Sequence, residues 1–450
     1  MRRAAAVFAL LGCAGRPPLS GVGEASPPGF RRNTNPATVF PVEAREAPRH
    51  DAHNPLRDLV PGAPAGGGAA AQPTPETPAA EAAAGVVWED PDGRVAPALQ
   101  AFRTGEHALH VIQLGDSHTE GDAFTGALRR RLWARLGDGG RGFVPIAGDQ
   151  WDVVRTLTGP WRVVRSGLRP SDAPDGLGLS RAIATSPQAV LRVATCTRCV
   201  GGRSANRITV YFRTLTSGGR FRVEVDGRAL ELVSTRGGGR YGVDVPDGAH
   251  AVAVRPEGDG PVEIYGVALD RSGDGARVDS AGIVGAQASH LLAEDWTVLT
   301  SQLADRAPTL VVLAFGTNES VSARRDPAEH GAALATLLER VRAAVPTATL
   351  AVFGPPDTEL RSTAQPGTFI PAPRLDGVIS AARATAAAAG AAFVDLRALM
   401  GGPGAMQAWS VERPPWAEPD HVHLTARGYA HLADALVEAL LGPAPGAPPP

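Results

Sequence analysis

Residues 108–119 read Ala-Leu-His-Val-Ile-Gln-Leu-Gly-Asp-Ser-His-Thr, a mostly apolar run that stops at Gly115 and is followed at once by polar side chains. Such a run is typical of a buried parallel strand. A helix is predicted to follow it, from about Gly121 to Leu136. Ser117 then lies at the carboxyl end of the strand, which is where open α/β sheets bind their ligands.

The same pattern returns later in the chain. Residues 308–315 (PTLVVLAF) form a second apolar run, which leads into residues 316–319 (GTNE). Asp326-Pro327 predicts the start of a helix that reaches about Ala344, because aspartate caps helices and proline suits their first turn. The alternation continues with strands expected at 349–353 and 392–396 and helices at 375–389 and 426–441. This order predicts an α/β fold of three layers, a mostly parallel sheet with helices on both faces.

A β-rich region interrupts the alternation. Residues 207–213 (RITVYFR) and 220–225 (RFRVEV) alternate polar and apolar side chains, and the second run meets the turn Asp226-Gly227. We expect an inserted antiparallel β-sandwich over 151–276, between two parts of an α/β domain at 86–150 and 277–441. The insertion is either a structural lid or spacer, or a module that helps to hold a polysaccharide.

The N-terminus indicates export. Met1-Arg2-Arg3 precedes a short apolar stretch that ends in Leu-Leu-Gly-Cys13, which resembles a bacterial lipoprotein box whose cysteine receives the lipid. A buried apolar start of the fold is the alternative. Residues 14–85 are rich in proline, alanine and glycine and predict a disordered tether, as does the tail at 442–450. We therefore expect residues 1–13 to be a signal peptide and the protein to reside in the cell envelope, on a lipid anchor.

Composition narrows the class of protein. The chain has 450 residues, 43% of them hydrophobic and 20% charged, with a formal net charge of −2. A balance so near neutral argues against attraction of the whole protein to nucleic acid or to an anionic membrane. Cys196 and Cys199 lack the second cysteine pair that a zinc site of this type needs, so a local disulfide is favoured over a metal or redox role.

Four motifs resemble the blocks of the SGNH, or GDSL-like, hydrolases. Residues 115–118 (GDSH) are similar to the first block and 280–287 (SAGIVGAQ) to the second, with Gly285 a better match for its functional glycine than Gly282. Residues 316–319 are similar to the third block, and 420–425 (DHVHLT), followed by Gly428-Tyr429, to the fifth. The resemblance covers about 106–146 and 277–441, and it implies the flavodoxin-like fold of that family.

These residue types suit acyl transfer through a serine. A serine hydroxyl needs a base, which His423 would supply, and Asp420 would orient that imidazole. His421 is the alternative base, but Asp420 is adjacent to it in sequence and poorly placed to orient it. The resemblance implies that the backbone amides of Ser117 and Gly285 and the Asn318 side chain stabilise the oxyanion. No cofactor or metal is expected.

Each of these residues also has a structural alternative. Ser117 could cap a helix, Asn318 could belong to a turn, and Gly285 could serve only helix packing. We expect Asp116 to hold the turn by hydrogen bonding, and leave open whether His118 and Glu319 line the pocket.

The substrate is suggested by the resemblance alone. The context of Ser117 and the β-rich insertion are similar to the SGNH subgroup that removes O-acetyl groups from bacterial peptidoglycan. An O-acetyltransferase acting on a glycan and a lipase or lysophospholipase remain alternatives, and an inactive glycan-binding lipoprotein is the least favoured. An acetylated glycan is thus the expected substrate, with a membrane contact only through Cys13 and no nucleic acid partner.

Overall fold

The computed structural model describes residues 88–442, apart from 106–107 and 274. It contains a parallel sheet of five strands in the order β13-β1-β14-β15-β18. These strands are β1 Leu109–Gly115, β13 Ala276–Gly282, β14 Leu310–Ala314, β15 Thr349–Phe353 and β18 Ala392–Val394. Every neighbouring pair runs parallel, so the carboxyl ends of the strands meet at one edge. β1 lies between β13 and β14, which therefore do not pair with each other.

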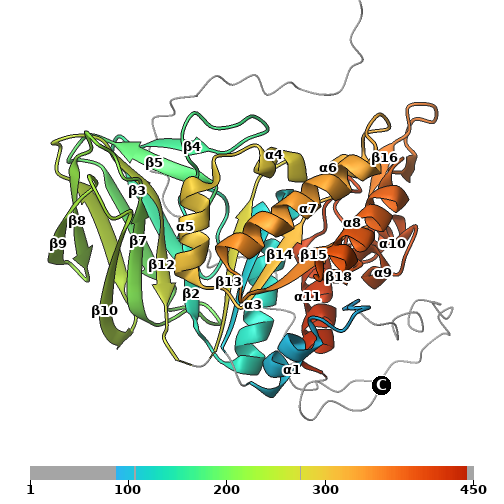
Figure 1. Cartoon of the computed structure of the whole chain (residues 1–450), viewed down its shortest axis with the longest axis horizontal. Coiled ribbons are helices and arrows are strands. Elements are labelled where there is room, and N and C mark those ends of the chain that lie inside the picture. Colours follow the sequence, from blue (N-terminus) through green and yellow to red (C-terminus); the bar gives the residue numbers. More distant parts are fainter. Residues whose placement is uncertain (1–87, 106–107, 274, 443–450) are drawn as a thin grey trace, which may run out of the picture. The chain divides into compact units, whose positions relative to one another are not determined.

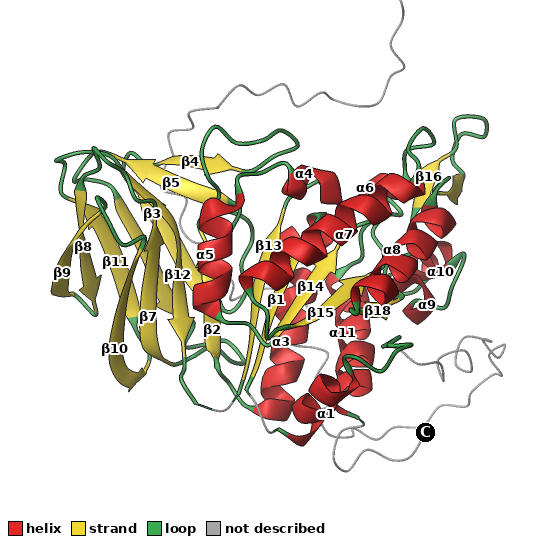
Figure 2. Cartoon of the chain, viewed as in Figure 1, coloured by secondary structure: helices red, strands yellow, loops and turns green. Residues whose placement is uncertain are grey.

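Helices cover both faces of this sheet (Figures 1 and 2). One face packs against α4 Ala288–Leu292, α5 Trp296–Arg306, α7 Pro327–Ala344 and α8 Leu375–Ala389. The other packs against α1 Ala96–Thr104, α3 Ala123–Leu136, α9 Leu396–Leu399, α10 Ala405–Val411 and α11 Ala426–Leu441. Successive side chains of a strand point to opposite faces, so Ile112 and Leu114 join the first core and Leu109 and Val111 the second.

The β-rich insertion forms two antiparallel sheets. One has the order β10-β7-β12-β5-β4, with β2 also paired to β12, and the other the order β3-β6-β11-β8-β9. The strands of the first sheet are β2 Gly140–Pro145, β4 Arg162–Arg165, β5 Ser180–Ala184, β7 Ala205–Phe212, β10 Arg240–Gly248 and β12 Val262–Asp270. Those of the second are β3 Val153–Thr158, β6 Val190–Thr195, β8 Arg220–Val225, β9 Arg228–Ser234 and β11 Ala251–Pro256. Apolar side chains of both sheets share one buried cluster, as expected for a sandwich.

Strand β2 lies earlier in the chain than the expected start of the insertion at 151. It pairs antiparallel with β12 from Gly140 to Pro145, and so belongs to the first antiparallel sheet. Glycine is required where this strand begins, since a Cβ on Gly140 would lie 2.6 Å from the Arg271 backbone nitrogen. The limits 151–276 therefore remain a prediction. Strand β2 shows that a segment before residue 151 already pairs with a strand of the β-rich insertion.

Most expected elements are confirmed. The helices at 375–389 and 426–441 and the strand at 349–353 have the predicted limits, and Asp326 caps α7 by accepting from the Ala328 amide. The helix expected at about 121–136 is α3, and a separate short helix, α2 Ser117–Glu120, precedes it, with Asp122 in a left-handed conformation between the two. The strand expected to reach 396 ends at Val394, since Asp395 caps α9.

Residues 1–87 and 443–450, which include the expected signal peptide, Cys13, tether and tail, lie outside the described residues. Within the described part of the chain, no helix is long and apolar enough to cross a membrane.

Candidate active site

The candidate nucleophile, Ser117, begins helix α2 directly after β1. The connection is tight, because a Cβ on Gly115 would lie 2.2 Å from the Thr119 hydroxyl oxygen and 2.6 Å from the Ala314 carbonyl oxygen. The Asp116 carboxylate caps the turn by accepting from the His118 amide at 3.0 Å. The turn thus holds Ser117 at the carboxyl edge of the sheet, in agreement with the structural role expected for Asp116.

His423 and Asp420 complete a hydrogen-bonded chain from Ser117. The distance from Ser117 Oγ to His423 Nε2 is 2.9 Å, and that from His423 Nδ1 to Asp420 Oδ2 is 2.7 Å. The other Asp420 oxygen accepts from the Val422 and His423 amides at 2.9 Å each. Because a carboxylate only accepts hydrogen bonds, Nδ1 carries a proton and Nε2 of the neutral ring is free to take one from Ser117.

The pKa shifts of Asp420 and His423 suit a general base. The hydrogen bond that His423 Nδ1 donates to Asp420 raises the pKa of His423 above its ordinary value, against the opposing effect of partial burial. Burial opposes ionisation of Asp420, but hydrogen bonds from the His423 ring and from backbone amides outweigh it and lower the pKa of this carboxyl. Asp420 therefore stays ionised, and the raised pKa of His423 makes its ring a stronger proton acceptor, as a general base requires.

Gly285 and Gly282 have different surroundings. Gly282 pairs with Gly115 across β13 and β1, and a Cβ on it would lie 2.4 Å from the Glu120 amide nitrogen, so this position needs glycine for packing. Gly285 has φ +74°, and the atoms nearest to its would-be Cβ are the Leu168 methyl groups at 3.8 and 3.9 Å. Glycine at 285 thus serves a left-handed conformation, in a segment that is not crowded by backbone.

Asn318 lies in α6 Thr317–Ser320, directly after β14. Its side-chain amide donates to the Ala286 carbonyl at 2.8 Å, which brings the third block against the residue that follows Gly285. The three predicted oxyanion donors therefore belong to segments that follow β1, β13 and β14, next to one another at one edge of the sheet. Their role toward an oxyanion remains a prediction.

His421 is held away from Ser117 by other partners. Its Nδ1 is 2.6 Å from Glu359 Oε2, and its ring stacks on Phe369 with the ring centres 3.5 Å apart. Both partners come from the hairpin of β16 Glu359–Arg361 and β17 Phe369–Pro371. His423, rather than His421, therefore contacts the serine. Neither Glu359 nor Phe369 lies in a recognisable motif, so sequence reasoning had no signal for them.

His118 is a second histidine beside the base. Its ring centre lies 5.1 Å from that of His423, and its Nδ1 is 2.7 Å from the Tyr429 hydroxyl. Burial, and then the positive charge that His423 can carry, lower the pKa of His118 to about 3, so it remains neutral. Burial raises the pKa of Asp116 to about 7. The sequence placed Tyr429 in the fifth block without predicting its contact with His118.

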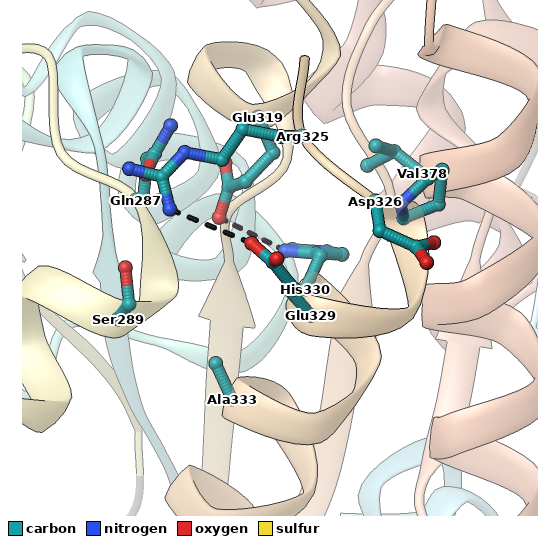
Figure 3. Close-up of a pocket in the computed structure, with 10 residues that line it drawn as sticks. Gln287, Ser289, Glu319, Arg325, Asp326, Glu329, His330, Ala333 and Val378 are labelled. Carbon is teal, nitrogen blue, oxygen red and sulfur yellow. Dashed lines mark hydrogen bonds and ion pairs between the residues drawn. The ribbon is translucent and has the colours of Figure 1, made fainter. Parts of the chain in front are cut away.

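The remaining expected residues lie elsewhere. Cys196 and Cys199 form a disulfide, with 5.4 Å between their Cα atoms. Within residues 88–442, apart from the three positions not described, no group of acidic, histidine or cysteine side chains is arranged to hold a metal ion. Glu319 lines a small cavity of about 80 Å³ whose lining residues do not include Ser117 or His423 (Figure 3).

The sequence matches the model of the GDSL-like Lipase/Acylhydrolase family over residues 241–431. That range contains Gly285, Asn318, Asp420 and His423, and the geometry joins Ser117 to it. The matched region belongs to this family. The protein is therefore a carboxylic ester hydrolase, and its parallel sheet with a β-rich insertion is an SGNH-hydrolase fold.

Solved structures resemble this hydrolase to different degrees. A peptidoglycan O-acetylesterase is 26% identical, with a TM-score of 0.65 and an alignment that covers 78% of this chain and 96% of that one. A family two carbohydrate esterase from Clostridium thermocellum, solved with cellohexaose, is 13% identical with a TM-score of 0.28, over 62% and 99% of the two chains. One from Cellvibrio japonicus is 11% identical with a TM-score of 0.25, over 64% and 98%. At these TM-scores the last two likenesses bear on neither fold nor function. No curated protein matches the sequence significantly.

Proposed function

We propose that this hydrolase removes O-acetyl groups from a cell-wall polysaccharide such as peptidoglycan, through an acetyl-enzyme on Ser117. The observation that carries the proposal is the hydrogen-bonded chain Ser117–His423–Asp420, with 2.9 and 2.7 Å between successive side chains. The choice of substrate is supported by the likeness to a peptidoglycan O-acetylesterase, which extends over 96% of that chain. On this proposal the enzyme works outside the cytoplasm, as the expected export segment and lipid anchor at Cys13 require.

The reaction follows from the positions of these groups. Ser117 Oγ attacks the ester carbonyl carbon while its proton passes to His423 Nε2, and the carbonyl oxygen becomes an oxyanion. The C–O bond to the sugar then breaks, and His423 returns the proton to the departing sugar oxygen. Water attacks the acetyl-enzyme by the same route, so that acetate leaves and Ser117 regains its proton. Asp420 stabilises the imidazolium at each stage.

Acetate release from O-acetylated peptidoglycan, compared with release from acetylated xylan, tests the substrate. We expect faster release from peptidoglycan, and near-complete loss of release in Ser117→Ala and His423→Ala. Ser410→Ala is the matched control, because the Ser410 hydroxyl only donates to the Gln407 carbonyl. Equal or faster release from xylan would contradict the choice of peptidoglycan, and unchanged rates in Ser117→Ala would contradict the triad.

Two further measurements separate the alternatives. Free acetate formed without an added acceptor supports hydrolysis, whereas acetylation of an added glycan without free acetate would make the protein a transferase. A fluorophosphonate probe should label the wild-type protein and not Ser117→Ala, because the probe reacts with an activated serine. Absence of labelling in the wild type would indicate an inactive binding protein.

A further inference from the structure

We propose that Glu319 is a positioning residue that holds the two predicted oxyanion segments, around Gly285 and Asn318, at their working distance. This inference rests on the proposed function. Glu319 directly follows Asn318 in α6, and only 6% of it is exposed. A carboxylate is costly to bury without hydrogen bonds, so its partners indicate what it does.

Glu319 joins three elements through one oxygen atom. Its Oε1 accepts from the backbone amide of Ala288, the first residue of α4, at 2.8 Å. The same oxygen is 2.9 Å from Nδ1 of His330 in α7, which is itself buried (Figure 3). Glu319, which follows Asn318, is thus hydrogen-bonded to Ala288, which lies three positions after Gly285.

Two more hydrogen bonds run beside these. The Asn318 amide donates to the Ala286 carbonyl at 2.8 Å, and the Gln287 side chain donates to the Asn318 carbonyl at 3.2 Å. Together with the bond from Ala288 to Glu319, three bonds tie residues 286–288 to residues 318–319. The segments around Gly285 and Asn318 are therefore clamped to each other directly.

The sheet cannot provide this connection. β1 separates β13 from β14, so no ladder of backbone hydrogen bonds sets the distance between the segments that follow them. Donors to an oxyanion must be fixed before the reaction, since reorganising them during it would cost catalytic rate. The three hydrogen bonds between residues 286–288 and 318–319, here called the clamp, fix the two segments where the sheet does not.

The acceptor atom of Glu319, and not its charge, is what the clamp uses. A negative charge close to a forming oxyanion is unfavourable by Coulomb's law. The neighbouring cation, Arg325, is paired with Glu329 at 3.6 Å instead. Glutamine keeps a carbonyl oxygen at the same place without the charge, so it should preserve the clamp.

Kinetics of Glu319→Ala and Glu319→Gln on a small chromogenic acetate ester test the inference. We expect Glu319→Ala to lower kcat about 10²–10³-fold, as loss of an oxyanion donor does, with KM changed less than about threefold. Glu319→Gln should keep kcat within about threefold of the wild type. Glu329→Ala, on the same cavity, is the matched control and should leave both constants unchanged.

The outcomes are distinguishable. A kcat near the wild-type value in Glu319→Ala would overturn the inference, and so would a Glu319→Gln variant as slow as Glu319→Ala. Thermal unfolding of each variant reports loss of folded protein separately. If Glu319→Ala does not fold, Gln287→Ala tests the inference instead, because it removes the hydrogen bond to the Asn318 carbonyl. This variant should lower kcat about tenfold. An unchanged kcat in Gln287→Ala would also overturn the inference. Ser117→Ala is measured in parallel. Turnover that remains in Ser117→Ala would contradict the proposed function. Loss of turnover in Ser117→Ala together with a normal kcat in Glu319→Ala would contradict only the role of Glu319.

Discussion

The molecule contains one aspartate–histidine pair at the carboxyl edge of the parallel sheet, in the candidate active site, and another where that sheet meets the β-rich insertion. At the edge, Asp420 and His423 are three residues apart and 2.7 Å from each other, with side chains 49% and 38% exposed. At the junction, His110 Nε2 of β1 is 2.9 Å from Asp279 Oδ2 of β13, with side chains 2% and 1% exposed. The same two chemical groups are thus placed in opposite surroundings.

The surroundings reverse the behaviour of the histidine. Asp420 raises the pKa of His423, whereas burial, aided by the charge of Arg306, lowers the pKa of His110 although Asp279 opposes it. Asp279 also accepts from Arg306 Nε at 2.9 Å and from the Phe143 amide of β2 at 2.7 Å. Of these two pairs, His423 has its second ring nitrogen 2.9 Å from a serine hydroxyl, so the pair at the edge is the one placed to act as a base.

The largest expected effect is at the Asp420–His423 pair. Asp420→Asn should lower kcat by about 10⁴, because the ring loses the carboxylate that selects its tautomer. The same change removes the main cause of the raised His423 pKa. Since the ring must be neutral to accept a proton, the acidic limb of the kcat/KM profile should move to lower pH. A limb that stays in place or moves to higher pH would contradict the assignment of Asp420.

The junction pair should affect stability instead. Asp279→Ala leaves Arg306 and the Phe143 amide short of a buried partner, so it should cost about 3–5 kcal/mol of unfolding free energy while kcat of the folded protein is kept. Urea unfolding measures this loss. Asp434→Ala is the control, because its ion pair with Arg131 is partly exposed and should contribute at most about 1 kcal/mol. Equal losses in the two variants would remove the distinction between the regions.

The disulfide of the insertion provides a third point of comparison. Cys196 and Cys199 close a loop of very few residues, so replacing both with serine should cost about 2 kcal/mol of unfolding free energy. We expect kcat to remain unchanged, since neither cysteine contacts the catalytic chain in the described residues. A fall in kcat at full folding would show that the insertion shapes the catalytic edge through this loop.

The smallest effect concerns pH. His110 has a lowered pKa in the folded state, so its contribution to stability is complete above the unfolded value of about 6.5 and is lost as the pH falls toward the folded value. His110→Gln places an amide nitrogen near the position of Nε2, so it keeps a donor for Asp279, and it does not titrate. The difference between the unfolding free energies at pH 7.5 and 5.5 should therefore be smaller in the variant than in the wild type. The reduction should be at most about 1.4 kcal/mol per pH unit. If the variant shows an equal or larger difference between the two pH values than the wild type, protonation of His110 does not contribute to the loss of stability at low pH.

Much of the catalytic edge was predictable because its signals are local. Apolar runs before Ser117 and before Asn318 indicate buried parallel strands, whose carboxyl ends must meet at one edge. Asp420 and His423 are close in sequence, so a short loop suffices to join them. The role expected for Glu319 stayed open, because its partners Ala288 and His330 lie 31 and 11 residues away.

The sequence by itself determined the parallel sheet and the sandwich, since apolar periodicity follows from short-range geometry. It also placed Ser117, Asp420 and His423 in one motif set, through their resemblance to the blocks of the SGNH hydrolases. Only the tertiary structure decided that His423 and not His421 contacts Ser117, because Glu359 and Phe369 arrive from a distant hairpin. It also decided that β2 joins the sandwich and that His110, Asp279 and Arg306 share one buried network. Contacts between distant segments depend on how the elements pack, and no local pattern encodes them.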